Sequence, residues 1–155
     1  MKKVLMSLIV LAASIFVCAP FGFAQGAAKT GPDPSLIRDA DLEKDSLHNL
    51  EVARHYFKLK KAYVAAIRRC EEIDAGNPTF AKMDEVLFIA GESSLRLADN
   101  KGKQKPKEKT PEQLRVDARV YLSRLVAGYP NSAFFKQAQE DLRALGGPIT
   151  EESKQ

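Results

Sequence analysis

Few residues of this chain have the types and the spacing that chemistry requires. His48 and His55 are seven positions apart, so a helix through both would place them on one side. A protein zinc site uses three or four ligands, and no other histidine or neighbouring cysteine is available to complete one. We therefore expect two surface histidines, and the sequence predicts neither a metal site nor a cofactor.

The other candidate groups also fit structural roles better than catalytic ones. Cys70 falls between Ile67 and Ile73 on the apolar side of a predicted helix, where a thiol behaves as a small hydrophobic group. Glu71 and Glu72 are adjacent, so a helix points them to different sides and they cannot act as an acid–base pair. The "GESS" stretch at 91–94 lacks the Gly-x-Ser-x-Gly form of a nucleophile elbow and follows no strand, so a tight helix crossing is the better interpretation. We predict that the protein is not an enzyme, with no catalytic residues.

A lysine-rich stretch, "DNKGKQKPKEK" at 99–109, concentrates the positive charge of the chain. It holds five lysines, whereas the rest of the chain is nearly balanced and lacks the broad basic face of a nucleic-acid binder. Such low-complexity composition does not form a core. We expect residues 99–110 to be a solvated insertion that buries nothing. Contact of its lysines with anionic lipid or with an acidic partner is the alternative.

The N-terminal residues have the composition of a secretory signal peptide. Lys2 and Lys3 precede an uncharged apolar run at 4–17, which is too short for a confident membrane span. Small residues at Gly22 and Ala24 offer a cleavage site, so we predict a signal peptide over 1–24 and a periplasmic mature chain.

Lipidation of Cys18 is the alternative and would make the protein an outer-membrane lipoprotein. The residues before this cysteine, Phe16 and Val17, are bulky, whereas lipoprotein cleavage usually needs a small residue there. Soluble export is therefore the preferred interpretation. Membrane association then requires either a partner or a lipidated Cys18.

The remaining chain is predicted to be one helical domain at 45–146, between a flexible leader at 25–44 and a polar tail at 147–155. Apolar residues recur every three or four positions in five segments, and no alternating pattern long enough for a strand occurs. The first helix is expected to begin near Asp45.

Local signals predict where these helices begin and end. Thr110, Pro111 and Gln113 have the pattern of a capping box with proline at the first helical position. Gly76 is expected to end a helix in the left-handed conformation. Thr79 is expected to cap the next helix, and Ser132 to start the last one.

Two segments repeat the same pattern at an offset of 52 residues. Ala66, Cys70, Ile73, Gly76 and Pro78 align with Ala118, Leu122, Leu125, Gly128 and Pro130. A small residue, two larger apolar residues and a proline at these intervals are typical of the second helix of a tetratricopeptide unit. We therefore expect the apolar residues of this pattern inside, with Ala66 and Ala118 where the helices cross. The usual period is about 34 residues, and the lysine-rich insertion accounts for most of the excess. The predicted fold class is all-α, with tetratricopeptide-like helical hairpin repeats and about five helices.

The stretch "LEVARHYFKLKKAYVAAIRR" at 50–69 resembles the C-terminal repeats of the BamD (YfiO) outer-membrane assembly lipoproteins. Those repeats share a Val-Ala-aromatic-aromatic first helix and an Ala-Tyr-x-Ala-Ala second helix. "GES" at 91–93 and "YPNSAFFKQAQEDL" at 129–142 are also similar to that family. The resemblance implies a shortened α-solenoid that acts as a scaffold in the cell envelope, with outer-membrane protein assembly as its process.

The expected partner is therefore a protein of the cell envelope, with no nucleic acid. Val52, Tyr56 and Leu59 form an apolar stripe beside the predicted core positions, and Tyr63 follows in the next helix. We predict that these four residues contact the partner; the alternative for Tyr56 and Tyr63 is a position in the core, where aromatic residues at these spacings are more often found. The alternative function is a peptidoglycan- or lipid-associated envelope factor that binds through the lysine-rich insertion.

Overall fold

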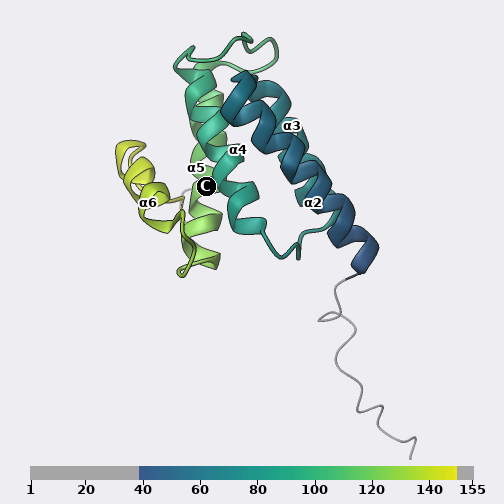
Figure 1. Ribbon diagram of the computed structural model, residues 1–155. Helices are drawn as coiled ribbons and strands as arrows, with labels where there is room; N and C mark the ends of the chain where they lie inside the picture. Colours follow the sequence, from purple (N-terminus) through teal and green to yellow (C-terminus); the bar gives the residue numbers. More distant parts are fainter. Residues whose placement is uncertain (1–38, 150–155) are drawn as a thin grey trace, which may run out of the picture. The chain divides into compact units, whose positions relative to one another are not determined.

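The computed structural model describes residues 39–149, and this part of the chain is all-helical, with five α-helices and no strand (Figure 1). The elements are α2 (Ala40–Arg54), the π-helix η2 (His55–Lys60), α3 (Tyr63–Gly76), α4 (Met83–Ala98), α5 (Pro111–Gly128) and α6 (Phe135–Ala144). The all-α prediction is confirmed. The predicted signal peptide, Cys18, residues 25–38 of the leader and residues 150–155 of the tail lie outside the described residues.

The first helix begins earlier than the sequence patterns predicted. Asp39 is its N-cap, because one carboxylate oxygen accepts the backbone N–H groups of Asp41 at 2.9 Å and Leu42 at 3.2 Å. Asp41 and Glu43 place negative charge in the first turn, where the helix dipole favours it. Residues 40–44, predicted as part of a flexible leader, therefore belong to α2.

The end of this helix is π-helical rather than α-helical. η2 is followed by its C-cap Lys61, which has a left-handed φ of 51°, and the Ala62 N–H donates to the Tyr56 carbonyl at 3.0 Å. π-helical turns are rare and are frequently found at functional sites. Phe57 stays buried here, but Leu59 points outward and is 70% exposed.

The capping box at the start of α5 is confirmed. Thr110 Oγ1 accepts the Gln113 N–H at 3.2 Å, and Gln113 Oε1 accepts the Thr110 N–H at 2.8 Å. Pro111 occupies the first turn, where its missing N–H costs no hydrogen bond. The capping box therefore holds the C-terminal end of the lysine-rich insertion at the start of α5.

Three other local predictions are wrong. Gly76 is the last residue of α3 and does not have a positive φ; the glycines that do are Gly146 and Gly147. Lys82 rather than Thr79 precedes α4, and α6 begins at Phe135. Asn77 and Ser132 bond across the fold, and Thr79 donates to Asn77 at 3.3 Å rather than capping α4. The Ser132 hydroxyl also accepts the Phe134 N–H at 3.1 Å, just before α6.

Each described helix packs mainly against its neighbours in the chain. α3 lies against α2 and α4, α5 lies against α4 and α6, and α2 also touches α4. Ala66 and Ala118 are fully buried, as predicted. Gly91 lets α4 approach α5, because a Cβ atom added there would lie 2.7 Å from Leu122 Cγ.

Two bidentate ion pairs join alternate helices. Arg54 of α2 donates to both carboxylate oxygens of Glu85 in α4, at 2.6 and 2.5 Å. Arg124 of α5 donates to both oxygens of Asp74 in α3, each at 2.7 Å. The α2–α3 hairpin is thereby tied to the α4–α5 hairpin through both of its helices.

Candidate binding sites

The predicted partner-binding residues do not share one environment. Val52 and Tyr56 are half-buried, and Leu59 is the most exposed large hydrophobic residue of the described chain. Tyr63 is 3% exposed and packs on Phe57, with ring centroids 5.9 Å apart. Tyr63 therefore belongs to the core and is not available to a partner. The name "Leu59 surface" is used below for Val52, Tyr56 and Leu59.

Phe57 and Tyr63, the aromatic residues beside the Leu59 surface, are packed against Arg96 of α4. The Arg96 guanidinium lies over the Phe57 ring, 4.4 Å from its centroid, and within 5.8 Å of the Tyr63 centroid. Arg96 also pairs with Glu92, one turn earlier in α4, at 2.7 Å. This packing fixes the inner side of η2 and leaves Leu59 on its outer side.

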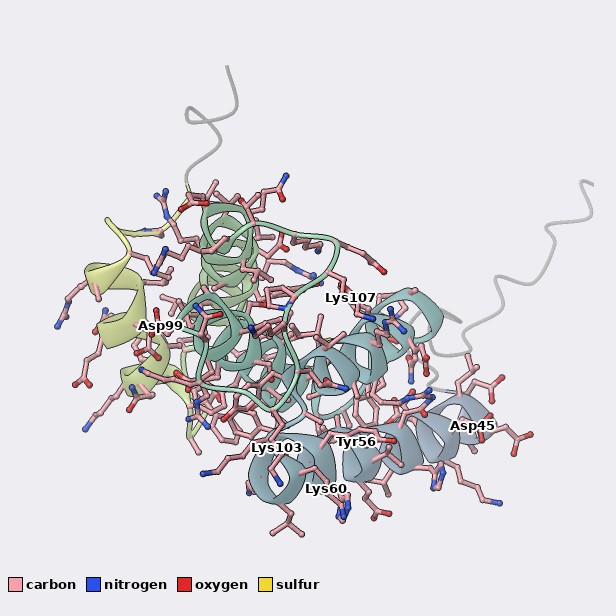
Figure 2. The ribbon with its side chains drawn as sticks, turned by 90° about the horizontal axis from the view of Figure 1, so that it is seen from above. Asp45, Tyr56, Lys60, Asp99, Lys103 and Lys107 are labelled. Carbon is pink, nitrogen blue, oxygen red and sulfur yellow. The ribbon has the colours of Figure 1, made fainter. Side chains whose placement is uncertain are left out.

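Residues 99–110, called the lysine loop below, fold back onto the end of η2. The Lys103 N–H donates to the Lys61 carbonyl at 3.1 Å, and Gly102 lies close to the Tyr63 ring. Figure 2 shows Lys60 and Lys103 at the same end of the helices, near Tyr56. The prediction that this insertion buries nothing is wrong.

The exposed lysines here leave positive charge next to Leu59. Lys101 pairs with Asp99 at 3.1 Å and Lys109 with Asp117 at 2.7 Å. Among the residues that the structure describes, Lys60, Lys103, Lys105 and Lys107 form no ion pair. Of these free cations, Lys60 and Lys103 lie at the end of η2, and together with Leu59 they form a surface that is both apolar and basic, which suits an acidic partner with an apolar contact.

A pocket of about 390 Å³ lies between α3, α5 and the lysine loop and is called the loop pocket below. Val64 and Ile67 of α3, Leu97 of α4 and Leu114 of α5 line its interior, and residues 104–109 form one wall. Apart from Val64, which is half-buried, these interior side chains are buried. Sequence reasoning missed this site because its walls come from separate segments. The feature of the sequence that could have indicated the pocket is Pro106, an apolar residue within the lysine run, which is half-buried in the structure.

Charged side chains surround the mouth of the loop pocket. Lys109 donates to Asp117 at 2.7 Å, and this hydrogen bond raises the pKa of Lys109. Tyr121 donates from its hydroxyl to Glu71 at 3.2 Å, and burial together with the Glu71 charge raises the pKa of Tyr121. Arg68 and Glu108 form a longer, exposed pair at 3.5 Å. The Lys109–Asp117 pair holds the end of the loop against α5.

A second hollow, to which α4, α5 and α6 contribute, is lined mainly by charged side chains, among them Glu92, Arg115 and Asp141. Glu92 is 8% exposed, and burial followed by the nearby Asp141 carboxylate raises its pKa, while Arg96 opposes that rise. The adjacent Ser93 hydroxyl is fully buried without a hydrogen-bond partner in the described part of the chain. The "GESS" stretch thus lies within the helix contacts, with Gly91 against Leu122, as predicted for a tight crossing.

The residues with potential chemistry are dispersed. His48 and His55 are exposed, while Cys70 is 1% exposed and burial raises its thiol pKa. Within residues 39–149, no three His, Cys, Asp or Glu side chains gather as metal ligands, and no helix is long and apolar enough to span a bilayer. The core position predicted for Cys70 is confirmed.

Comparison of the chain with protein-family models gives no match, and comparisons with curated proteins and with solved structures give none either. The functional argument therefore rests on the chain's own geometry.

Proposed function

We propose that this protein is an exported, non-enzymatic scaffold of the bacterial cell envelope, built from tetratricopeptide-like repeats and similar to BamD. In this proposal it binds a protein partner in outer-membrane protein assembly. The observation that carries the proposal is the repeated hairpin contact: Ala66 and Ala118 are fully buried at equivalent positions of α3 and α5. Stacked hairpins of this kind commonly serve as binding surfaces for other proteins.

The contacts between the hairpins support this proposal. Arg54–Glu85 and Arg124–Asp74 join alternate helices, and neighbouring helices supply most of the remaining packing. Because each repeat then contacts chiefly the next one, side chains on the outer faces are left available to other molecules. Export follows from the composition of residues 1–24.

The Leu59 surface is the proposed contact with the partner. Leu59 is 70% exposed on a π-helical turn. A partner that covers it removes this apolar surface from water, which favours binding. The neighbouring lysines favour a partner that carries carboxylates around an apolar hollow. Tyr56 extends the contact toward α2 and is half-buried, so it is already ordered before binding.

A crosslinking pull-down from envelope extract tests the proposal. We expect Leu59→Ser to reduce capture of the partner roughly tenfold or more, as for a central apolar contact. Val116→Ser is the matched control, because Val116 is 53% exposed on α5, away from η2. Thermal melts of both variants establish that each is folded. Equal capture by Leu59→Ser and the unaltered chain would contradict the proposed contact.

The free lysines favour a second candidate function, association with peptidoglycan or anionic lipid. Lys60 and Lys103 are exposed, without ion pairs in the described chain, and are brought together by the Lys103–Lys61 backbone bond. We expect Lys60→Gln with Lys103→Gln to reduce sedimentation with anionic vesicles or with peptidoglycan sacculi at low salt. Lys44→Gln with Lys136→Gln removes the same charge elsewhere and serves as the control. Unchanged sedimentation of the first double variant excludes this function for the lysine loop.

A further inference from the structure

We infer that the loop pocket binds a single-chain amphiphile, a molecule with one alkyl chain and an anionic head group. This inference is independent of the proposed scaffold function, because it concerns the α3–α5 side of the lysine loop rather than the Leu59 surface. Its basis is an apolar interior with a basic mouth.

The interior of the loop pocket suits an alkyl chain. Its volume of about 390 Å³ falls in the range of small-molecule sites, roughly 300–1,000 Å³. Val64, Ile67, Leu97 and Leu114 present only aliphatic carbon to it. A polar ligand would lose hydrogen bonds to water there, whereas every methylene group that leaves water for this interior favours binding.

The mouth of the loop pocket suits an anionic head group. Lys105 and Lys107 line it, and neither forms an ion pair within the described residues. Arg68 is bound only through an exposed pair with Glu108 at 3.5 Å, which an entering anion can replace at little cost. Three carboxylates, those of Glu71, Glu108 and Asp117, also line the pocket, but with Lys109 included the cationic side chains number four, so the lining keeps a net positive charge. Lys109 pairs with Asp117, and the Tyr121 hydroxyl donates to Glu71.

The loop wall is held in place before a ligand arrives. Lys103 is bonded to Lys61 near one end, and the Thr110–Gln113 capping box fixes the other end. The Lys109–Asp117 pair adds a contact to α5. Because the loop is already ordered, ligand binding does not have to supply the entropy of ordering it.

Calorimetric titration of the purified chain with decanoate, decyl phosphate and decanol tests the inference. We expect saturable one-to-one binding of decanoate or decyl phosphate, and the tighter of the two identifies a carboxylate or a phosphate head group. Decanol, with the same chain and no charge, is expected to bind roughly tenfold more weakly, in line with charge-assisted contacts at the mouth. Inorganic phosphate alone is expected not to bind measurably.

Two variants test separately how the interior and the mouth of the loop pocket contribute to ligand binding. Val64→Phe fills the pocket from its half-buried wall and is expected to weaken decanoate binding roughly tenfold or more. Lys105→Gln with Lys107→Gln is expected to weaken decanoate binding about threefold to tenfold and to leave decanol binding unchanged. Lys44→Gln with Lys136→Gln, which removes two exposed lysines outside the pocket, is the control.

Three results would overturn the inference. They are an absence of saturable binding by both anionic amphiphiles, equal binding of decanol and decanoate, and equal loss of binding in the control double variant. The lysine substitutions lie on an exposed loop and do not disturb the core, so they remain informative if Val64→Phe does not fold.

Discussion

Small side chains at three buried positions allow the helices to approach one another. Ala66 and Ala118 are fully buried on α3 and α5, and Gly91 on α4 faces Leu122. Larger side chains at these points would force the helices apart, because interiors are close-packed and yield little space. These residues therefore set the distance between neighbouring helices.

Gly91→Ala tests this dependence. The added Cβ would lie 2.7 Å from Leu122 Cγ, so Leu122 or the helix must move. Overpacking costs about 1–3 kcal/mol, and the gain in helix propensity offsets about 1 kcal/mol of it. We expect a net loss of unfolding free energy, measured by urea denaturation.

Gly76→Ala is the matched control for this substitution. Gly76 is also helical, but nothing lies within 4 Å of a Cβ added there. We expect it to be neutral or stabilising by up to about 1 kcal/mol. A Gly91→Ala chain as stable as the Gly76→Ala chain would show that the α4–α5 contact is not tight.

Core positions were predictable from the sequence where helical periodicity decides them. Ala66, Cys70 and Leu122 were expected inside and are buried, because spacing alone sets the face of a regular helix. The spacing of Tyr63 also favoured the core, and its assignment as a partner contact was wrong: it is 3% exposed, with Phe57 and Gly102 covering its ring. That cover depends on a loop far along the chain, and local spacing carries no information about it.

At the scale of elements, the Arg54–Glu85 pair is the strongest polar contact between α2 and α4. Its two hydrogen bonds are short, and the Glu85 side chain is 16% exposed. The bond from Arg54 is the main cause that lowers the pKa of Glu85, and burial opposes it. Charge-assisted bonds of this geometry are stronger than neutral ones.

Glu85→Gln should therefore change the pH dependence of stability. A lowered folded-state pKa means that the stabilisation is fully present above the unfolded value, about 4.3, and is lost as pH falls through the folded value. We expect the variant to be about 1–3 kcal/mol less stable at neutral pH, with this difference shrinking in acid.

Urea denaturation of both chains between neutral and acidic pH measures the effect. Glu140→Gln on α6 is the control, because Glu140 is exposed and outside the ion pairs of the described chain. A stability difference for Glu85→Gln that does not change with pH would rule out the ion pair as its source.

Element boundaries were predictable where the signal is local. The capping box of α5 requires only Thr110 and Gln113, so its sequence pattern was sufficient. Before α4, Asn77 instead donates to Glu43 and Ser46 of α2, each at 3.2 Å. Ser132 donates to Asp84 of α4 at 2.7 Å. Bonds across the fold therefore take the place of a cap before α4, whereas the Ser132 hydroxyl makes both a bond across the fold and a local one, to the Phe134 N–H at 3.1 Å.

In the described chain as a whole, α4 packs chiefly against α3 and α5 and also touches α2, while α6 packs chiefly against α5. Figure 1 shows α4 placed between α3 and α5. Ile89, Ala90 and Leu97 of α4 are all at most 3% exposed, and they belong to one core with residues of the adjoining helices. α6 contributes Ala138 and Leu142 to that core, and Phe134 before it stacks on Phe88 at 4.6 Å.

Hydrogen exchange should reveal this difference. We expect backbone amides of α4 to exchange at least about tenfold more slowly than those of α6, because opening α4 disrupts two helix contacts. Exchange measured by mass spectrometry on peptides covering each helix tests this. Equal protection of α6 and α4 would mean that the chain opens only as a single unit.

The number and order of the helices could be predicted from the spacing of apolar residues along the chain, but the loop pocket could not. Val64, Leu97 and Leu114 belong to three helices, and each is an ordinary apolar residue in its own segment. Their meeting depends on the path of the lysine loop, whose composition predicts no contacts.

The packing of each helix on its sequence neighbours also bears on how the chain folds. Contacts between segments adjacent along the chain require short loop closures, which favours rapid folding. The α2–α3 hairpin is complete once Gly76 has been made, before any part of α4 is synthesised. During translation, or while the chain is threaded N-terminus first through a narrow channel, the early hairpin can form and serve as the template on which later helices assemble.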